Sequence, residues 1–170
     1  MTNRLRNTLV LALLLAAGSL LAGCFQTKLS LGSGDNATVN VQYCGEWHFT
    51  WKEEDQAKSA TLLVLGFDAK RYYAEWKQND ETIRFSAFLV PVGQATFVQL
   101  TPLGGDKDES NTHIIARVQL DGKKLILRHL EEEFFEGVTT DEALRQKIEQ
   151  NVENDKMYAA TLSGALISQP

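Results

Sequence analysis

The sequence lacks the short motifs by which most enzymes are recognised. It contains no Gly-x-Ser-x-Gly elbow, no His-Glu-x-x-His zinc motif and no glycine-rich phosphate loop. Its three histidines, His48, His113 and His129, lie in separate segments without metal-ligand spacing. The acidic stretch 106–110 does not follow the order of a calcium loop. We therefore expect a protein that is not an enzyme and that holds no metal or other cofactor.

Basic residues are also scarce relative to acidic ones. The chain has 17 lysines and arginines against 22 aspartates and glutamates, and its formal net charge is −5. No basic stripe runs along it. This balance argues against nucleic acid as a partner and against charge-driven binding to anionic lipid head groups.

No apolar run is long enough to cross a membrane. The run from Leu9 to Leu21 is shorter than the roughly 20 residues that a spanning helix needs. Arg4 and Arg6 precede it and small residues follow it, which is the layout of a secretory signal peptide. We therefore expect residues 1–23 to be removed from the mature protein.

The end of this signal, Leu21-Ala22-Gly23-Cys24, resembles the lipobox of bacterial lipoproteins. The resemblance implies acylation of Cys24 by fatty acyl groups such as palmitate, and hence attachment to the cell envelope. Phe25, where aspartate would retain a lipoprotein on the inner membrane, implies the outer membrane, facing the periplasm. An ordinary signal peptidase site followed by a free Cys24 is the alternative.

With Cys24 acylated, Cys44 is the one remaining thiol, and no internal disulfide is possible. Cys44 is interpreted as a small buried apolar residue at the start of a strand, with a reactive or intermolecular thiol as the alternative. Residues 24–38 are small and polar and predict a flexible tether. Residues 39–170 are then one domain.

Alternation with a period of two predicts antiparallel strands through most of that domain. Seven segments show it: 46–51, 60–67, 70–78, 82–90, 95–101, 112–120 and 123–130. Asp121-Gly122 suits a tight hairpin turn, and Pro91 is expected to end its strand. Short connections indicate an up-and-down sheet or a small lipocalin-like barrel, so the fold class is mainly β.

The C-terminal part changes character. Phe134 and Phe135 are expected to dock onto the sheet or to cap one end of it. Thr139 and Glu142 have the spacing of a capping box, which predicts a helix over about 140–152. Residues 157–167 are compatible with either a last strand or a short helix.

Aromatic side chains crowd the first five predicted strands. Most are expected in the core, but four are candidates for the wall of a pocket at the barrel mouth: Trp47, Trp51, Tyr72 and Trp76. A barrel filled by its own side chains is the alternative.

Gly45-Glu46-Trp47 is similar to the Gly-x-Trp opening of lipocalins, whose tryptophan closes the bottom of the barrel. Arg128 is the candidate for the basic residue that packs on that tryptophan. Residues 84–102 and 113–130 resemble blocks of small bacterial lipoproteins that also carry Gly-x-Trp, a likeness that implies no activity.

Together these features predict a non-enzymatic, lipid-anchored envelope protein whose β-domain binds a small apolar ligand or a periplasmic partner. One alternative is a structural or accessory subunit of an envelope complex. Another is an inhibitor of a hydrolase that uses the loop 103–111.

Overall fold

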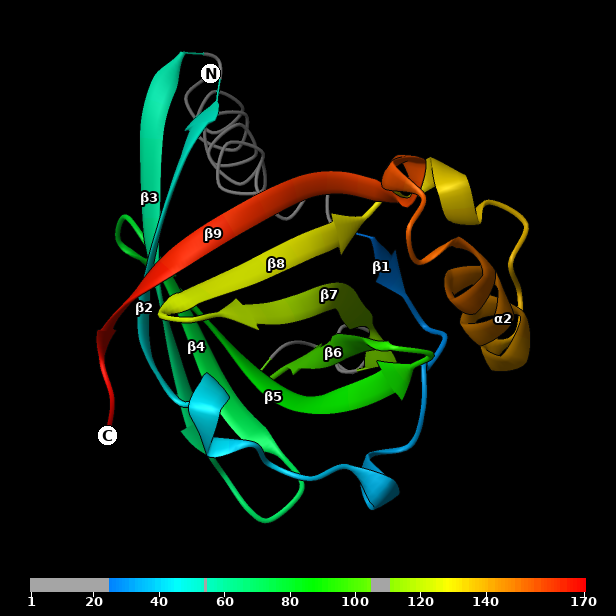
Figure 1. Cartoon of the computed structure of the whole chain (residues 1–170), viewed down its shortest axis with the longest axis horizontal. Coiled ribbons are helices and arrows are strands. Elements are labelled where there is room, and N and C mark those ends of the chain that lie inside the picture. Colours follow the sequence, from blue (N-terminus) through cyan, green and yellow to red (C-terminus); the bar gives the residue numbers. More distant parts are fainter. Residues whose placement is uncertain (1–24, 54, 105–110) are drawn as a thin grey trace, which may run out of the picture.

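The computed structural model describes residues 25–53, 55–104 and 111–170, and strands make up most of them (Figure 1). The strands are β1 (Gln26–Thr27), β2 (Gly45–Glu53), β3 (Gln56–Gly66), β4 (Tyr72–Gln78), β5 (Glu81–Val92), β6 (Ala95–Pro102), β7 (His113–Asp121), β8 (Lys124–Leu130) and β9 (Tyr158–Ser168). The helical elements are η1 (Gly34–Asn36), η2 (Val41–Tyr43), η4 (Glu133–Phe135), α2 (Asp141–Asn151) and η5 (Asp155–Met157).

Strands β2 to β9 form a closed antiparallel barrel in which each strand pairs with the next one along the chain. Strand β9 lies between β8 and β2 and completes the ring, while β1 adds two residues to the outer edge of β7. The predicted mainly-β, up-and-down barrel with a C-terminal helix is confirmed. The ambiguous segment 157–167 is the eighth barrel strand, and it supplies the closure.

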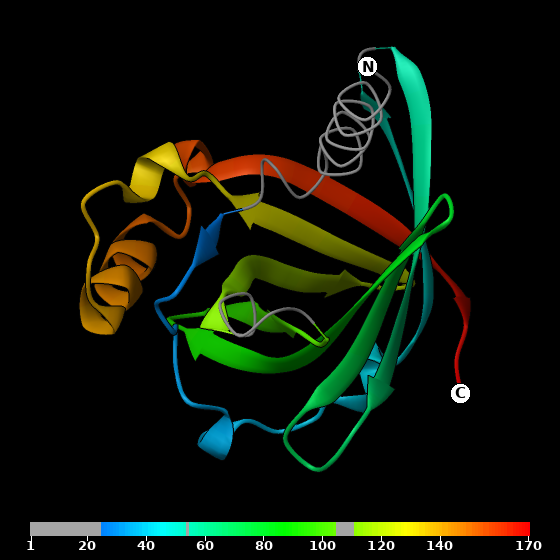
Figure 2. The same cartoon turned by 180° about the vertical axis from the view of Figure 1, so that it is seen from behind.

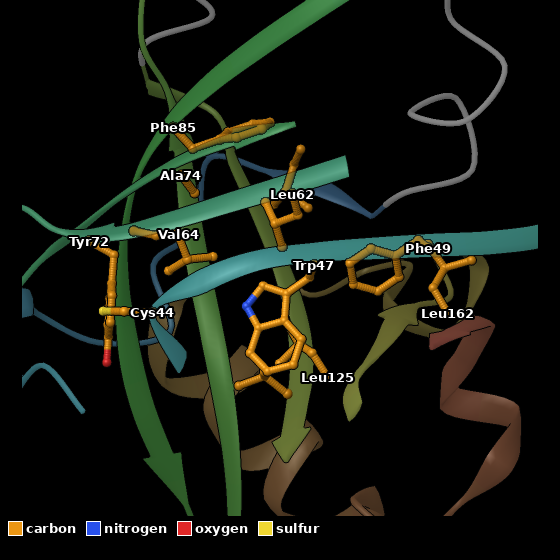
Figure 3. Packing of buried hydrophobic residues seen from close by; sticks show 13 residues of the cluster. Cys44, Trp47, Phe49, Leu62, Val64, Tyr72, Ala74, Phe85, Leu125 and Leu162 are labelled. Carbon is orange, nitrogen blue, oxygen red and sulfur yellow. The ribbon is translucent and has the colours of Figure 1, made fainter. Parts of the chain in front are cut away.

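Alternation along the strands divides the apolar residues into two cores. Inward-facing side chains such as Trp47, Leu62, Val64 and Leu125 gather in the barrel interior (Figure 3). A second core lies on the outside, where Leu144 and Ile148 of α2, both fully buried, pack on the wall. Burying a side chain of this size contributes about 1.5–3 kcal/mol, so α2 is held by its apolar stripe.

The prediction of a flexible tether over residues 24–38 is wrong for the described part of that segment. Phe25 and Leu31 are 7% and 2% exposed and belong to the outer core. The buried side chain of Gln99 accepts a hydrogen bond from the Leu31 amide at 2.8 Å, and Arg145 donates to the Leu31 carbonyl. Burial of the Phe25 and Leu31 side chains therefore orders this segment despite its Gly-Ser composition. The chain then runs past one end of the barrel (Figure 2).

Pro91 does not end its strand, contrary to expectation, because β5 continues to Val92. Pairing between β4 and β5 stops at Ala87, and beyond it no strand of the described residues pairs with this edge of β5. The Pro91 carbonyl accepts a hydrogen bond from Arg145 of α2 at 2.9 Å. The backbone N and C=O of Pro91 therefore point toward the helix and not toward β6, which pairs with the other edge of β5. The missing amide of proline therefore removes no ladder hydrogen bond.

The C-terminal helix agrees with the prediction apart from its cap. Thr140, one residue after the predicted Thr139, accepts the hydrogen bond from the Ala143 amide and caps α2. Phe135 docks as expected, with its ring 4.8 Å from that of Phe25 on the outside of the barrel. Residues 1–24 lie outside the described part of the chain, so the signal peptide and the acylation of Cys24 stay predictions.

Closure of the barrel requires a glycine at position 164. Phe49 of β2 pairs with Gly164 of β9, and a Cβ at Gly164 would lie 2.6 Å from two atoms of the Phe49 ring. No real Cβ contact is so short, so the ring or the strand would have to move.

We expect Gly164→Ala to lower the free energy of unfolding by about 1–3 kcal/mol, because the added carbon would overpack the contact with the Phe49 ring. Urea unfolding followed by circular dichroism measures this. The control is Gly66→Ala at the end of β3, where the nearest atom to the added carbon is 3.6 Å away. Equal stabilities of the two variants would contradict this account of closure.

Candidate ligand-binding site

One end of the barrel, here called the closed end, is crossed by η2 and pinned by the Gly-x-Trp segment. The indole nitrogen of Trp47 donates a hydrogen bond to the Tyr43 carbonyl at 3.0 Å. Gly45 has φ +151°, and a Cβ there would lie 2.8 Å from both Leu166 and the Ser168 carbonyl. Trp47 is 1% exposed and belongs to the floor of the interior.

The lipocalin-like basic partner of Trp47 is not Arg128. Leu127 and His129 line the interior, so Arg128 between them faces outward. Its guanidinium lies 3.7 Å from the centre of the Tyr158 ring and donates to Asp155 at 2.7 Å. Arg128 therefore ties β8 to η5 on the outer surface.

An apolar cavity of about 70 Å³ lies in the interior above this floor. Its wall comes from η2 and from every strand between β3 and β8: Tyr43, Leu62, Val64, Tyr72, Ala74, Ala87, Leu89, Val98, Leu100, Ala116, Val118, Leu125, Leu127 and His129. The space exists because alanines occupy inward positions on β4, β5 and β7. Larger residues at those positions would fill it.

Of the four predicted wall residues, Tyr72 lines this cavity and the three tryptophans do not. Trp47 lies in the floor, while Trp51 and Trp76 lie toward the other end with ring centres 6.3 Å apart. Bulky indoles fill the interior, and the cavity borders on smaller side chains. The signal that could have located it is the inward alternation of Ala74, Ala87 and Ala116.

The hydroxyl of Tyr72 holds the closed end together. It accepts a hydrogen bond from the Asn40 amide at 2.6 Å and donates to the Asn40 carbonyl at 3.2 Å. Burial raises the pKa of Tyr72 above its usual value, so the hydroxyl stays neutral and able to do both. Cys44, beside it in Figure 3, is free and 6% exposed, which agrees with the interpretation as a small buried residue.

His129 is the one histidine among the residues that line the cavity. Burial lowers the pKa of its imidazole, which favours the neutral ring in an otherwise apolar wall. The other histidines lie elsewhere: His48 is exposed, and His113 pairs with the Thr101 hydroxyl at 3.0 Å. Within the described ranges, no three His, Cys, Asp or Glu side chains form a group that could hold a metal ion.

A second feature is an aromatic cluster nearer the end opposite the closed end. The ring centre of Phe49 lies 5.4 Å from that of Trp76, and the Trp76 ring in turn contacts the Trp51 ring. The Trp76 indole donates to Gln78 at 3.5 Å, whereas the buried Trp51 indole nitrogen has no acceptor among the described residues. Leaving a buried donor unsatisfied costs about 1–3 kcal/mol.

The outer wall carries the strongest charge cluster. Glu75, whose side chain is 11% exposed, accepts from Lys77 at 2.9 Å, Arg84 at 3.0 Å and the Tyr73 hydroxyl at 2.8 Å. The hydrogen bond from Lys77, followed by that from Tyr73, lowers the pKa of Glu75 to about 2. The cluster joins β4 to β5 outside the barrel, away from the cavity.

Comparisons with known proteins give no relative: no family model, no curated protein and no solved structure matches this chain. In the part of the chain that the structure describes, no helix has both the length and the apolar character needed to span a membrane.

The burial of His129 predicts a pH dependence of stability. Its folded-state pKa is below the unfolded value of 6.5. As the pH falls below that value the unfolded chain takes up a proton that the folded chain does not, so stability falls. His129→Gln should therefore lose less stability than the wild type between about pH 7 and pH 5. Thermal unfolding across this range measures the difference.

The control is His48→Gln on the exposed face of β2, which removes a histidine outside the cavity and keeps His129 in place. His113, whose pKa burial also lowers, remains in both variants and leaves a residual slope. A profile of His129→Gln that coincides with the wild type would contradict the placement of His129.

Proposed function

We propose that this protein is a non-enzymatic, lipid-anchored protein of the cell envelope whose barrel binds a slim apolar ligand. The observation that carries the proposal is the apolar cavity between the inward faces of β3 to β8. Each buried methylene of a ligand contributes about 0.8 kcal/mol. A volume of about 70 Å³ is well below the roughly 300–1,000 Å³ of pockets for drug-sized molecules. It therefore favours part of a single alkyl chain over a ring system.

The pairing of β2 with β9 supports a route of entry. The two strands pair only from Glu46 to Phe49 on β2, and beyond Phe49 the β2–β3 hairpin rises away from β9 (Figure 1). Ala160, the partner of His129 across β8 and β9, is exposed. Opposed residues share one face of a sheet, so the inner face of the barrel is reachable from solvent here.

We test the cavity with Ala116→Leu. Ala116 is 1% exposed and lines the cavity, so leucine should take up the space of the ligand. Binding of dodecanol, measured by titration calorimetry, should weaken roughly tenfold or more, which is about 1.4 kcal/mol.

The matched control is Ala165→Leu, on the exposed face of β9, which should bind like the wild type. Thermal unfolding of both variants verifies that they fold. Failure of the wild type to bind dodecanol, or equal binding by Ala116→Leu, would overturn the interior site.

The anchor half of the proposal rests on Leu21-Ala22-Gly23-Cys24 and on where the next residue lies. Phe25 is buried against Phe135, so an acylated Cys24 would hold the barrel close to the bilayer, without a long spacer. Attachment to the outer membrane, facing the periplasm, is the location that Phe25 after the cysteine favours.

Cys24→Ala tests the anchor. Two or more acyl chains anchor a protein stably, whereas none leaves this acidic domain without a membrane contact. The wild type should sediment with membranes and the variant should appear in the soluble periplasmic fraction. Cys44→Ala, which keeps Cys24, is the control. Continued sedimentation of Cys24→Ala would exclude the lipid anchor.

A surface at the closed end favours a second candidate, docking on an envelope complex. Val41 is 73% exposed and Phe67 is 69% exposed. Val41 lines a groove with Leu65 and the chain end at Pro170. Exposed apolar side chains gathered in one place are typical of a protein contact. The third alternative, an inhibitory loop over 103–111, falls mostly on residues 105–110, outside the described residues.

A further inference from the structure

The far end of the barrel, opposite the closed end, carries polar groups that the apolar cavity does not use. Trp51 and Lys58 face each other across β2 and β3. Trp51 follows Trp47 and Phe49 at alternate positions, so all three share the inward face of β2. Lys58, as the partner of Trp51, lies on that same face and is half-buried.

Both groups are short of partners. The buried Trp51 indole nitrogen has no acceptor among the described residues. None of the ion pairs formed within the described ranges includes Lys58. Glu53 lies on the same face of β2, and no ion pair joins it to Lys58. The result is an indole donor and a lysine side chain on the same inward face of the sheet, with the Trp51 ring centre 6.3 Å from that of Trp76.

The strand pairing connects these groups to the cavity. Trp76 pairs with Leu62 of β3, and Leu62 lines the cavity. Trp76 therefore neighbours both the cavity-lining Leu62 and the Trp51 ring. A molecule with its chain in the cavity would pass Trp76 before its head reached Trp51 and Lys58.

The same end of the barrel also carries β1, the strand that follows the proposed anchor. Strand β1 pairs with β7 at Ile114 and His113, the start of β7. Because neighbouring strands are antiparallel throughout, the start of β7 lies at the same end as the final residues of β2. An anchor just before Phe25 would thus bring this end of the barrel toward the membrane, the richest source of amphiphiles.

We propose that the far end binds the anionic head of a single-chain amphiphile, with the Trp51 indole donating to a head-group oxygen and Lys58 pairing with its charge. The alkyl chain lies along Trp76 and enters the cavity. This inference rests on the proposed function, since it names the ligand class for the same interior site. A carboxylate and a phosphate head share the necessary chemistry, which is negative charge on acceptor oxygens.

The test compares three ligands of equal chain length with the purified full chain: dodecanoate, dodecyl phosphate and dodecanol. Titration calorimetry should give at least tenfold tighter binding of one anionic ligand than of dodecanol. Lys58→Gln should remove most of this preference and leave dodecanol binding unchanged. Lys52→Gln, on the exposed outward face of β2, is its control and should behave like the wild type.

Trp51→Phe provides a readout that a purely structural role would not give. It keeps an aromatic ring and removes the unsatisfied donor, so the ligand-free variant should be at least as stable as the wild type. Its affinity for the preferred anionic ligand should fall about fivefold or more. Trp76→Phe, which removes an indole donor that already has an acceptor, should not gain stability in this way.

The outcomes separate the two proposals. If none of the three ligands binds the wild type, the proposed function fails and this inference fails with it. If dodecanol binds as well as both anions, or if Trp51→Phe and Lys58→Gln leave anion binding unchanged, the interior site stands and the head-group site is overturned. If dodecyl phosphate binds more tightly than dodecanoate, the preferred head group of the ligand is a phosphate.

Discussion

The pairing of β9 with β2 is the contact on which this structure depends most. Without it, β2 and β9 would be the two free edges of a curled sheet, and the inward faces would be open to water. Gly164 makes the contact possible because the Phe49 ring occupies the space where any other residue would place a Cβ. The pairing is short, however, and ends at Phe49. The same contact therefore closes the barrel at one end and leaves β2 and β9 unpaired toward the other.

Two hydrophobic cores stabilise the fold, one inside the barrel and one on its outer wall. The outer core of α2, η4 and the segment after Phe25 covers the wall formed by β5 to β8. Because that wall is held from outside, the interior need not be completely filled to be stable. Small side chains at inward positions then leave space among Leu89, Val98 and Leu127. Trp51 retains a buried donor that finds no acceptor within the described ranges, a local cost that the rest of the fold tolerates.

The barrel strands were largely predictable because alternation is a local property of the sequence. The closure was not, since residues 157–167 are mostly small and give a weak period, and Gly164 matters only through Phe49 on a distant strand. The packing of residues 25–38 was missed for a similar reason. Its composition is that of a linker, and its order depends on Phe25 and Leu31 meeting a surface made by residues far along the chain.

The candidate site shows the same limit. Tyr72 was identified as a wall residue, but the tryptophans were chosen for their size, and size makes a side chain fill a space rather than border it. The inward face of each strand was readable from the sequence, whereas the level at which each residue lies along the barrel depends on the strand register. That register brings Ala87 opposite Tyr72 and places His129 in the wall.

The most direct test of the account is the position of a bound chain inside the barrel. Protein labelled at its leucine and valine methyl groups, with saturating dodecanoate, should show nuclear Overhauser contacts from the alkyl chain to Leu89, Val98 and Leu127. Contacts confined to exposed methyl groups such as those of Val41, or no contacts at all, would contradict it.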